Sequence, residues 1–356
     1  MRPIEEPIQL ALIGIGQRGK QWADAVYENP AATTVAYVDI DGEALAWAQE
    51  RFSLPSNAMF HDIGMALDAR EVDAVILVTP PMVRGEQCDQ LIERGLPIMA
   101  EKPLTMGFES TLAVTRKARE RQVPLAAGFN FRYLNVTQKM KELLQEGELG
   151  EPSFARIFLY WHRTGRRPTG NRYPLVMEHP MALEQSVHAL DLIRFVYETE
   201  VKSLHALTHN PPWSPYVGDA TATALLELKN GMLINYLGTW MMQSQVREYD
   251  WRTDCTKGAV FQRSMFGDLF VARAGSDVLE SVPLQDDEPF VDDTKKLLDG
   301  FVRSLLAGAP PSPGATDNLK TMALTCAFIE SAESGQRVDM ADFYRRHGVA
   351  PNELLE

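Results

Sequence analysis

The chain of 356 residues has little cysteine, no long uncharged apolar run and no excess of basic residues. Its three cysteines are far apart and odd in number, which argues against a disulfide framework and favours a reducing, cytoplasmic setting. No apolar stretch is long enough to cross a bilayer, and the N-terminus lacks the apolar centre of a signal peptide. The net charge of −13 argues against a nucleic-acid partner. We therefore expect no membrane and no nucleic-acid partner.

What is present is an ordinary globular composition, 45% hydrophobic and 23% charged. The length favours two domains over one core. The first third alternates short apolar runs with helical patterns, which is typical of a doubly wound parallel α/β sheet of the Rossmann type. Residues 201–207, 220–229 and 232–240 follow one another as strands without intervening helices, which predicts an open, mostly antiparallel sheet flanked by helices. We predict an α/β domain over residues 1–130 and an α+β domain over residues 131–356.

The most informative motif begins where the apolar run of residues 8–13 meets the sequence G-I-G-Q-R-G at residues 14–19. Gly14 permits a tight turn, Gly16 lets the backbone approach a diphosphate, and Gly19 lets the following helix pack close to the strand. The free N–H groups and positive dipole end of that helix would face the phosphates. The order of strand, glycine loop and helix predicts dinucleotide binding, the alternative being a glycine-rich turn in an ordinary βα unit.

Asp39 ends a second apolar run, residues 35–38, and lies twenty residues past Gly19. At the tip of a second strand its carboxylate can accept hydrogen bonds from both ribose hydroxyls of an adenosine. The same charge would repel the 2′-phosphate of NADP, and residues 40–42 include no Arg or Ser to receive it. NAD is therefore the expected cofactor.

Lys102 follows the apolar strand of residues 97–100, within the sequence Glu101-Lys102-Pro103. The carboxyl ends of parallel strands form the ligand edge of such a sheet. A lysine there can donate to a substrate oxygen and to a cofactor ribose, whereas the alternative is a solvated loop charge.

A second constellation lies on a helix predicted over residues 184–197. Glu184, His188 and Asp191 follow the spacing of one helix face. A histidine beside a carboxylate can accept a proton near neutral pH, as oxidation of an alcohol requires. Glu184 should favour the imidazolium and raise the pKa of His188 above about 6.5. The alternatives are a core histidine, or a zinc site that adds His179 but lacks the usual thiolates or H-E-x-x-H spacing.

Taken in order, these motifs resemble the glucose–fructose oxidoreductase / inositol dehydrogenase (Gfo/Idh/MocA) family. The resemblance covers nearly the whole chain and rests on residues 14–19, Asp39, residues 79–81, 101–103 and 128–133, Glu184, His188 and Asp191. It implies a Rossmann domain, a second domain with an open sheet, and a tightly held nicotinamide cofactor. It also implies a sugar or polyol substrate, and a homodimer or homotetramer formed through the C-terminal sheet.

The resemblance also implies roles for single residues. Lys102 corresponds to the lysine that polarises the reacting hydroxyl, and His188 to the histidine that takes its proton. Glu184 falls where many members have Asp, and Arg84 replaces a frequent His with an effect that the sequence leaves open. The implied cofactor-binding residues are Gly14, Gly16, Gln17, Arg18, Gly19, Asp39, Thr79, Pro80, Glu101, Lys102 and Asn130. The candidate substrate contacts are Arg132, Trp161, His162 and Trp240.

The basic segment at residues 161–173 can face the same cleft. An aromatic ring there can stack on a sugar, and Arg166 or Arg167 can bind a carboxylate or phosphate, which would suit an acidic sugar. The alternative is a solvated loop.

The predicted function is an NAD-dependent oxidoreductase that transfers a hydride between a hydroxyl of a sugar, polyol or sugar derivative and nicotinamide, with no metal. Two alternatives remain: an NAD-dependent glycosidase that uses transient oxidation, and a non-catalytic regulator that senses NAD or a sugar. The sequence identifies neither the sugar nor the carbon that is oxidised.

Overall fold

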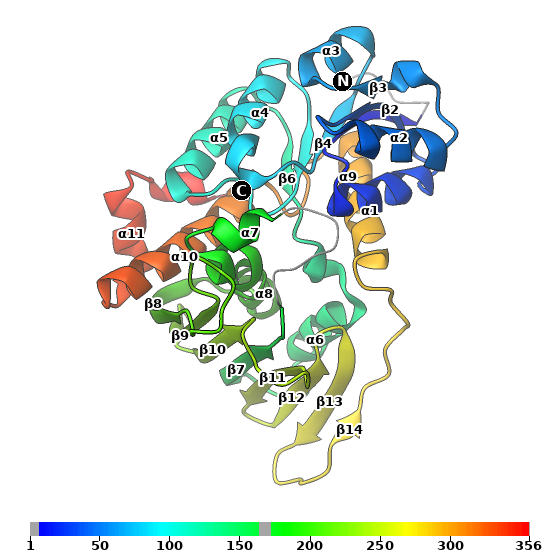
Figure 1. The fold of residues 1–356 in the computed structure, drawn as a ribbon. Coiled ribbons are helices and arrows are strands. Elements are labelled where there is room, and N and C mark those ends of the chain that lie inside the picture. Colours follow the sequence, from blue (N-terminus) through cyan, green and yellow to red (C-terminus); the bar gives the residue numbers. More distant parts are fainter. Residues whose placement is uncertain (1–6, 164–171, 356) are drawn as a thin grey trace.

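The computed structural model describes residues 7–163 and 172–355, so Arg166 and Arg167 lie outside the described residues. Figure 1 shows two β-sheets, with the N-terminal one (blue to cyan) above the one formed by the middle of the chain (green to yellow). Within the described ranges, no helix is both long and apolar enough to span a membrane.

The first sheet has six strands in the order β3-β2-β1-β4-β5-β6, and its neighbouring strands pair in parallel. Its strands are β1 (Ile8–Ile13), β2 (Ala32–Val38), β3 (Met59–Phe60), β4 (Ala74–Leu77), β5 (Ile98–Ala100) and β6 (Leu125–Ala127). The connecting helices are α1 (Gln17–Tyr27), α2 (Gly42–Arg51), α3 (Ile63–Ala69), α4 (Pro81–Glu93) and α5 (Phe108–Glu120), with a short turn η1 (Ser56–Ala58). Because both faces are covered, β4 is apolar and buried throughout. The predicted doubly wound sheet is confirmed, and its strand order reverses beside β1, where ligands bind in such folds.

The second sheet has nine strands in the order β14-β13-β12-β11-β7-β10-β9-β8-β15. They are β7 (Pro152–Tyr160), β8 (Val201–His209), β9 (Thr221–Leu228), β10 (Leu233–Thr239), β11 (Glu248–Cys255), β12 (Gly258–Ser264), β13 (Gly267–Arg273), β14 (Glu280–Ser281) and β15 (Val338–Asp339). β7 and β10 are parallel and the other described pairs are antiparallel, which confirms the predicted mostly antiparallel sheet.

The two faces of the second sheet differ. One face packs against α8 (Val187–Tyr197) and α10 (Ala315–Ser334) in a large apolar core. Along the strands the side chains alternate between this core and the opposite face. On β7, β8, β9 and β10, four large apolar side chains are more than half exposed: Phe154, Leu207, Leu225 and Leu233. The second sheet is therefore open on one side.

The chain crosses between the sheets more than once. η2 (Asn130–Tyr133) and α6 (Asn135–Gln145) lead from the first sheet to the second. After β14, α9 (Asp292–Ala307) returns to pack on α1, and its apolar stripe, which includes Leu297 and Phe301, joins the core of the first sheet. The chain ends with α11 (Met340–Arg346) and η4 (Pro351–Leu354). The return of α9 places residues late in the chain beside the glycine loop.

The segment that carries Glu184 and His188 is not one regular α-helix. α7 (Tyr173–Val176) is followed by η3 (Met181–Ser186), a π-helix, and only then by α8. The predicted α-helix over residues 184–197 is therefore wrong in its first turn. A π-turn is wider than an α-turn and changes the direction of the side chains before it, so the four-residue spacing of Glu184 and His188 does not place them on one α-helical face.

Candidate active site

The glycine loop after β1 combines two glycines that the fold requires with one that leaves space. Gly14 has φ +91°, and an added Cβ would lie 2.8 Å from the backbone nitrogen of Thr79. At Gly19 a Cβ would lie 2.0 Å from the carbonyl oxygen of Gly14, so the helix could not pack as it does. At Gly16 a Cβ would meet nothing within 4 Å. The open side at Gly16 is where a diphosphate would approach the backbone.

The start of α1 fits a dinucleotide. Gly16 is its N-cap and supplies no side-chain hydrogen bond, and the first turn holds no acid. The positive end of the helix dipole is therefore not neutralised by the helix's own first turn. Asp39 Oδ2 accepts a hydrogen bond from the N–H of Ile15 at 2.6 Å, and Oδ1 accepts one from the N–H of Asp41 at 2.9 Å. These bonds fix a carboxylate between the glycine loop and the tip of β2, with lone pairs left for a ribose.

Arg18, in the first turn of α1, forms a partly buried ion pair with Glu101. Arg18 Nε donates to Glu101 Oε1 at 2.6 Å, and Trp22 Nε1 donates to the same oxygen at 2.8 Å. Burial raises the pKa of Glu101, but Arg18 and Trp22 more than offset it, so the pKa is lowered overall. Arg18 Nη1 also donates to Thr294 Oγ1 of α9 at 2.8 Å. Arg18 thus joins α1, the loop after β5 and α9.

Arg84, whose role the sequence left open, holds two loops together. Its buried guanidinium donates from Nε to the carbonyl oxygen of Thr79 at 2.6 Å, and from Nη1 to the carbonyl oxygens of Glu101 and Pro103. Thr79 follows β4, and the other two residues flank Lys102. Arg84 therefore fixes the backbone on both sides of Lys102 against the end of β4.

Lys102 contacts the second part of the molecule. Its Nζ donates to the backbone oxygen of Glu184 at 3.1 Å and lies 3.5 Å from Glu184 Oε2. The Lys102 and Glu184 side chains are only 14% and 10% exposed, so this ion pair is shielded from bulk water. Tyr173 Oη donates to Glu184 Oε1 at 2.5 Å. We call Lys102, Glu184 and His188 the catalytic cluster, after the role that the sequence predicts for them.

His188, at the start of α8, is buried against two aromatic rings. Its imidazole stacks on Phe131 with ring centres 4.2 Å apart, and Phe129 lies edge-on at 6.4 Å. Burial, followed by the charges of Lys102 and Arg18, lowers its pKa well below the ordinary 6.5. The prediction that Glu184 raises this pKa is wrong. The carboxylate is bonded to Tyr173 and Lys102, so burial and nearby cations dominate at His188.

Asp191 does not join the catalytic cluster, contrary to the predicted alignment. Its carboxylate accepts from Arg132 Nε at 2.7 Å and from Arg132 Nη2 at 2.6 Å, and also from Thr321. Arg132 Nη1 donates to Asp317 at 2.5 Å. The guanidinium is thus occupied by two carboxylates, and the geometry gives Arg132 a structural role in place of the predicted substrate contact.

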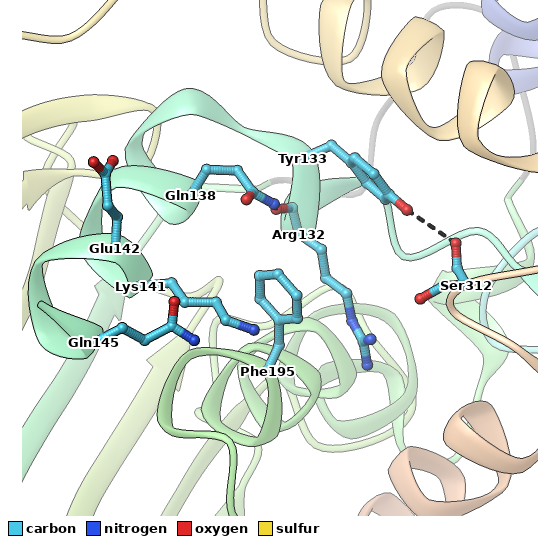
Figure 2. Close-up of a pocket in the computed structure, with 8 residues that line it drawn as sticks. All are labelled: Arg132, Tyr133, Gln138, Lys141, Glu142, Gln145, Phe195 and Ser312. Carbon is cyan, nitrogen blue, oxygen red and sulfur yellow. Dashed lines mark hydrogen bonds between the residues drawn. The ribbon is translucent and has the colours of Figure 1, made fainter. Parts of the chain in front are cut away.

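Arg132 also borders a cavity of about 470 Å³ that is separate from the catalytic cluster. Figure 2 shows the ring of Phe195 between the side chains of Lys141 and Arg132, whose charged groups lie 4.1 and 5.1 Å from the ring centre. The cavity is lined by Arg132, Tyr133, Gln138, Lys141, Glu142, Gln145, Phe195 and Ser312. Lys141 is paired with Glu198 at 2.8 Å. Since both cations already have acidic partners, the cavity has no free charge to recruit an anion.

The remaining substrate candidates differ in exposure. Trp240, predicted as a substrate contact, is fully buried, and the Arg163 guanidinium lies 4.2 Å from its ring centre. It therefore offers no open face to a sugar. Trp161 and His162 are half-buried, and His162 Nδ1 lies 2.8 Å from the carbonyl oxygen of Met242. Only these two remain as candidates.

Asn130, predicted at the nicotinamide end, is buried beyond β6 and donates from Nδ2 to Asp293 of α9. Burial raises the pKa of Asp293 to about 6. The amide of Asn130 is therefore oriented by the carboxyl group of Asp293, which lies 163 residues further along the chain and could not be identified from the local sequence.

The zinc site considered as an alternative is not assembled. Within the described ranges, the one group of three residues close enough to hold a metal is Glu178, His179 and Glu333. Neither Glu184 nor His188 belongs to it. His179 Nε2 instead lies 3.1 Å from Glu333 on α10.

Sequence reasoning missed several residues of this site. Phe129 and Phe131, which enclose His188, flank Asn130 within the motif at residues 128–133. The spacing of these two aromatic residues around Asn130 is therefore a signal in the sequence that could have identified them. Tyr173 belongs to the basic segment of residues 161–173. Its partner Glu184 lies eleven residues further along the chain, in a π-helix that no pattern in the sequence indicates. The role of Arg84 depends on the backbone oxygens of Glu101 and Pro103, which lie seventeen and nineteen residues further along the chain.

Known proteins share this architecture. A family model described as the oxidoreductase family with an NAD-binding Rossmann fold matches residues 8–129, and one described as the GFO/IDH/MocA C-terminal domain matches residues 137–261. The chain is 25% identical over 376 residues to an inositol 2-dehydrogenase of Rhodococcus erythropolis, covering 97% of this chain and 98% of the relative.

Two solved structures have the same fold. An oxidoreductase from Agrobacterium radiobacter in complex with NAD+, L-tartaric acid and magnesium has a TM-score of 0.84 and 23% identity, over 94% of this chain and 99% of that one. A levoglucosan dehydrogenase in complex with NADH and levoglucosan has a TM-score of 0.81 and 17% identity, over 94% and 100%. With both family models matched in order along one chain, this protein belongs to the Gfo/Idh/MocA family of oxidoreductases and carries an NAD-binding Rossmann domain.

Proposed function

We propose that this oxidoreductase moves a hydride between a secondary hydroxyl of a cyclic polyol or sugar and NAD, with Lys102 and His188 handling the hydroxyl proton. Residues 1–130 would hold the cofactor and residues 131–356 the substrate. The observation that carries the proposal is the meeting of both halves at the shielded contact of Lys102 with Glu184, next to His188. NAD supplies the hydride acceptor when bound.

The proposed cofactor residues surround the open side of the glycine loop. Gly16 and the start of α1 face the diphosphate, and Asp39 binds the adenosine ribose. Thr79 and Pro80 follow β4, and Lys102 follows β5, at the same edge of the sheet. Asn130, beyond β6, would lie at the nicotinamide end.

Lys102 would act as the electrophile toward the reacting oxygen. An ammonium has three N–H donors, and the structure directs two of them at Glu184. The third can donate to the substrate oxygen and stabilise the negative charge that develops when its proton leaves. In a shielded site such a donor is worth far more than in water.

His188 would accept the hydroxyl proton. A general base must be unprotonated to act, and the lowered pKa keeps the imidazole neutral at pH 7. Phe129 and Phe131 exclude water from the ring and hold its plane. Lys102, which lowers this pKa, therefore prepares both groups for the same step.

The substrate class follows from the relatives. The chain is similar along its full length to an inositol 2-dehydrogenase, so a ring of secondary hydroxyls is the first class to test. A screen of inositols, aldoses, anhydrosugars and sugar acids with NAD, followed by NADH absorbance, tests the proposal directly. Turnover with at least one polyol or sugar supports it, and no turnover with any of them contradicts it.

The alternatives make different predictions in the same screen. A glycosidase that oxidises transiently would release a sugar from a glycoside without accumulating NADH. A regulator would bind NAD and sugar with no turnover, which is at odds with a site that keeps both a lysine donor and a neutral histidine. A zinc enzyme would lose activity with a chelator.

We also propose that the protein forms a homodimer or homotetramer through the open face of its second sheet. Phe154, Leu225 and Leu233 are 55%, 64% and 59% exposed and border one apolar groove across β7, β9 and β10. Exposed apolar patches of this kind mark interfaces. Light scattering of Leu225→Arg should give a smaller species than wild type, whereas an unchanged mass would contradict this interface. The three free cysteines fit the proposed reducing cytoplasm.

A further inference from the structure

Tyr173 contacts the catalytic cluster from outside every motif that identified it. Its hydroxyl donates to Glu184 Oε1 at 2.5 Å. The other carboxylate oxygen, Oε2, lies 3.5 Å from Lys102 Nζ, and the backbone oxygen of Glu184 accepts from the same ammonium at 3.1 Å. One carboxylate therefore connects a phenol to the proposed electrophile.

The phenol is suited to act as a permanent donor. Burial, together with the carboxylate of Glu184, raises the pKa of Tyr173 above its ordinary value of 10. Among the described residues, the other charged groups acting on the catalytic cluster or on Tyr173 are Arg18 on α1, Arg84 on α4 and Glu101 after β5, and the titratable member of the cluster on α8 is His188. The hydrogen bonds of Arg84 go to backbone oxygens, so Arg84 does not replace Tyr173 as a donor to Glu184.

The direction of the Lys102 ammonium depends on this carboxylate. Two of its three N–H groups are directed by atoms of Glu184. Without the Tyr173 hydroxyl, Glu184 Oε1 loses its bond and the carboxylate can rotate away from the lysine. The third N–H, which must meet the substrate oxygen, would then lose its fixed orientation. Small misplacements of a reacting group can cost up to about a hundredfold in rate.

We propose that Tyr173 is a positioning residue that locks the Glu184 carboxylate and thereby aims Lys102 at the reacting oxygen. This inference rests on the proposed function and adds to it a residue from α7. Glu184 is long enough for one carboxylate to span both Tyr173 and Lys102, and an aspartate, one methylene shorter, would not reach both.

The inference is tested by a double-mutant cycle over Tyr173→Phe and Glu184→Asp. Tyr173→Phe keeps the ring and removes only the hydroxyl, and kcat should fall roughly tenfold while NAD affinity stays unchanged. In the Glu184→Asp background the shorter side chain no longer spans both partners, so Tyr173→Phe should change kcat by less than about twofold. Equal effects of Tyr173→Phe in the two backgrounds would overturn the inference.

Tyr197→Phe is the matched control. Tyr197 is half-buried like Tyr173, and its hydroxyl is hydrogen-bonded to Thr253 at 2.6 Å and to Trp251 at 2.9 Å, but it lies at the far end of α8. Tyr197→Phe should lower the melting temperature of the protein without lowering kcat. Circular dichroism measures the folded fraction of each variant. If kcat falls in both variants only as much as the folded fraction does, Tyr173 has a structural role and the inference fails.

A readout independent of turnover separates this inference from the proposed function. Trinitrobenzenesulfonate labels unprotonated amines, and the labelling of Lys102 can be followed by mass spectrometry at fixed pH. When Glu184 is no longer held by Tyr173, Lys102 loses its fixed partner and is free to move away from it, so Tyr173→Phe should raise its labelling rate a few-fold. An unchanged rate overturns the inference even if no sugar is oxidised. Wild-type turnover with an unaffected Tyr173→Phe overturns it while leaving the proposed function intact.

Discussion

The glycine loop and the catalytic cluster lie at the same edge of one sheet but are built in opposite ways. The glycine loop is made by backbone conformation within six consecutive residues, and its shape depends on the absence of side chains at Gly14 and Gly19. The catalytic cluster is made by side chains that meet across 82 residues, between Lys102 and Glu184. The first can therefore be deduced from local sequence, and the second requires the fold. This contrast implies that substitutions in the cluster should change the rate, and substitutions in the loop should change cofactor binding.

The largest effect is expected at His188. His188→Ala should lower kcat by roughly 10²–10⁴-fold, because a positioned general base contributes about that much, while NAD affinity stays near the wild-type value. Steady-state kinetics and fluorescence titration with NADH measure the two quantities. His209→Ala, at an exposed position on β8, is the matched control and should leave both unchanged. A His188 variant that loses cofactor affinity but keeps kcat would break the division between cluster and loop.

Lys102→Ala should have the next largest effect. Removing one donor to a developing negative charge costs about 10²–10³-fold in kcat. The loss should appear in kcat more than in the NAD dissociation constant, because the ammonium is needed mostly when the oxygen loses its proton. Lys229→Ala, an exposed lysine after β9, serves as the comparison. Unchanged kcat in Lys102→Ala would mean that this residue is only a loop charge.

On the loop side, Asp39 should control the choice of cofactor. Asp39→Asn keeps an oxygen that can accept from the N–H of Ile15 but removes the charge, so discrimination against NADP should fall by roughly tenfold or more. The ratio of kcat/KM for NAD and NADP measures this. A wild-type enzyme that already uses both cofactors equally would contradict the assignment.

Gly16 and Gly19 should differ in how a substitution affects folding, and the smallest effect is expected at Gly16. Gly16→Ala should change the free energy of unfolding by less than about 0.5 kcal/mol, because a Cβ meets no protein atom there, yet it should weaken NAD binding. Gly19→Ala should destabilise the fold by about 1–3 kcal/mol, since its Cβ would overlap the carbonyl of Gly14. Urea unfolding without NAD separates the two. Equal destabilisation by both variants would contradict the space seen at Gly16.

The same contrast explains what the sequence could predict. Apolar runs, their alternation with helices and the position of glycines are local patterns, and they predicted both sheets and the dinucleotide loop. The π-turn of η3 has no such pattern, because Glu184 and His188 keep a spacing that an α-helix would also show. As a result the predicted alignment of Glu184 with His188 and Asp191 was wrong. The predicted direction of the His188 pKa was wrong for another reason, because burial and nearby cations dominate there.

Long-range partners account for the other errors. Arg132 carries the spacing of a site residue, but Asp191 and Asp317, 59 and 185 residues away, take its guanidinium. Trp240 ends a strand near the cleft, but Arg163 and Tyr216 cover its ring. In both cases the residue type was suitable for binding a sugar, and only the surroundings decided otherwise.

The lowered pKa of His188 has a consequence for folding as well as catalysis. An unfolded chain takes up a proton at this histidine near pH 6.5, whereas the folded chain does not until well below that value. Its contribution to stability is therefore present above pH 6.5 and is lost as the pH falls below it. Denaturant unfolding of wild type and His188→Ala between pH 5 and 7 should show this dependence only in wild type.

We propose that a buried, neutral His188 takes the hydroxyl proton beside Lys102. The most direct measurement is the pH dependence of kcat/KM for oxidation, which reports the ionisation of groups in the free enzyme. We expect the rate limb assigned to His188 to have its midpoint well below pH 6.5 and to disappear in His188→Ala. A limb at or above pH 6.5 that vanishes in this variant would show a histidine charged by a neighbouring carboxylate, and would contradict the proposed neutral base.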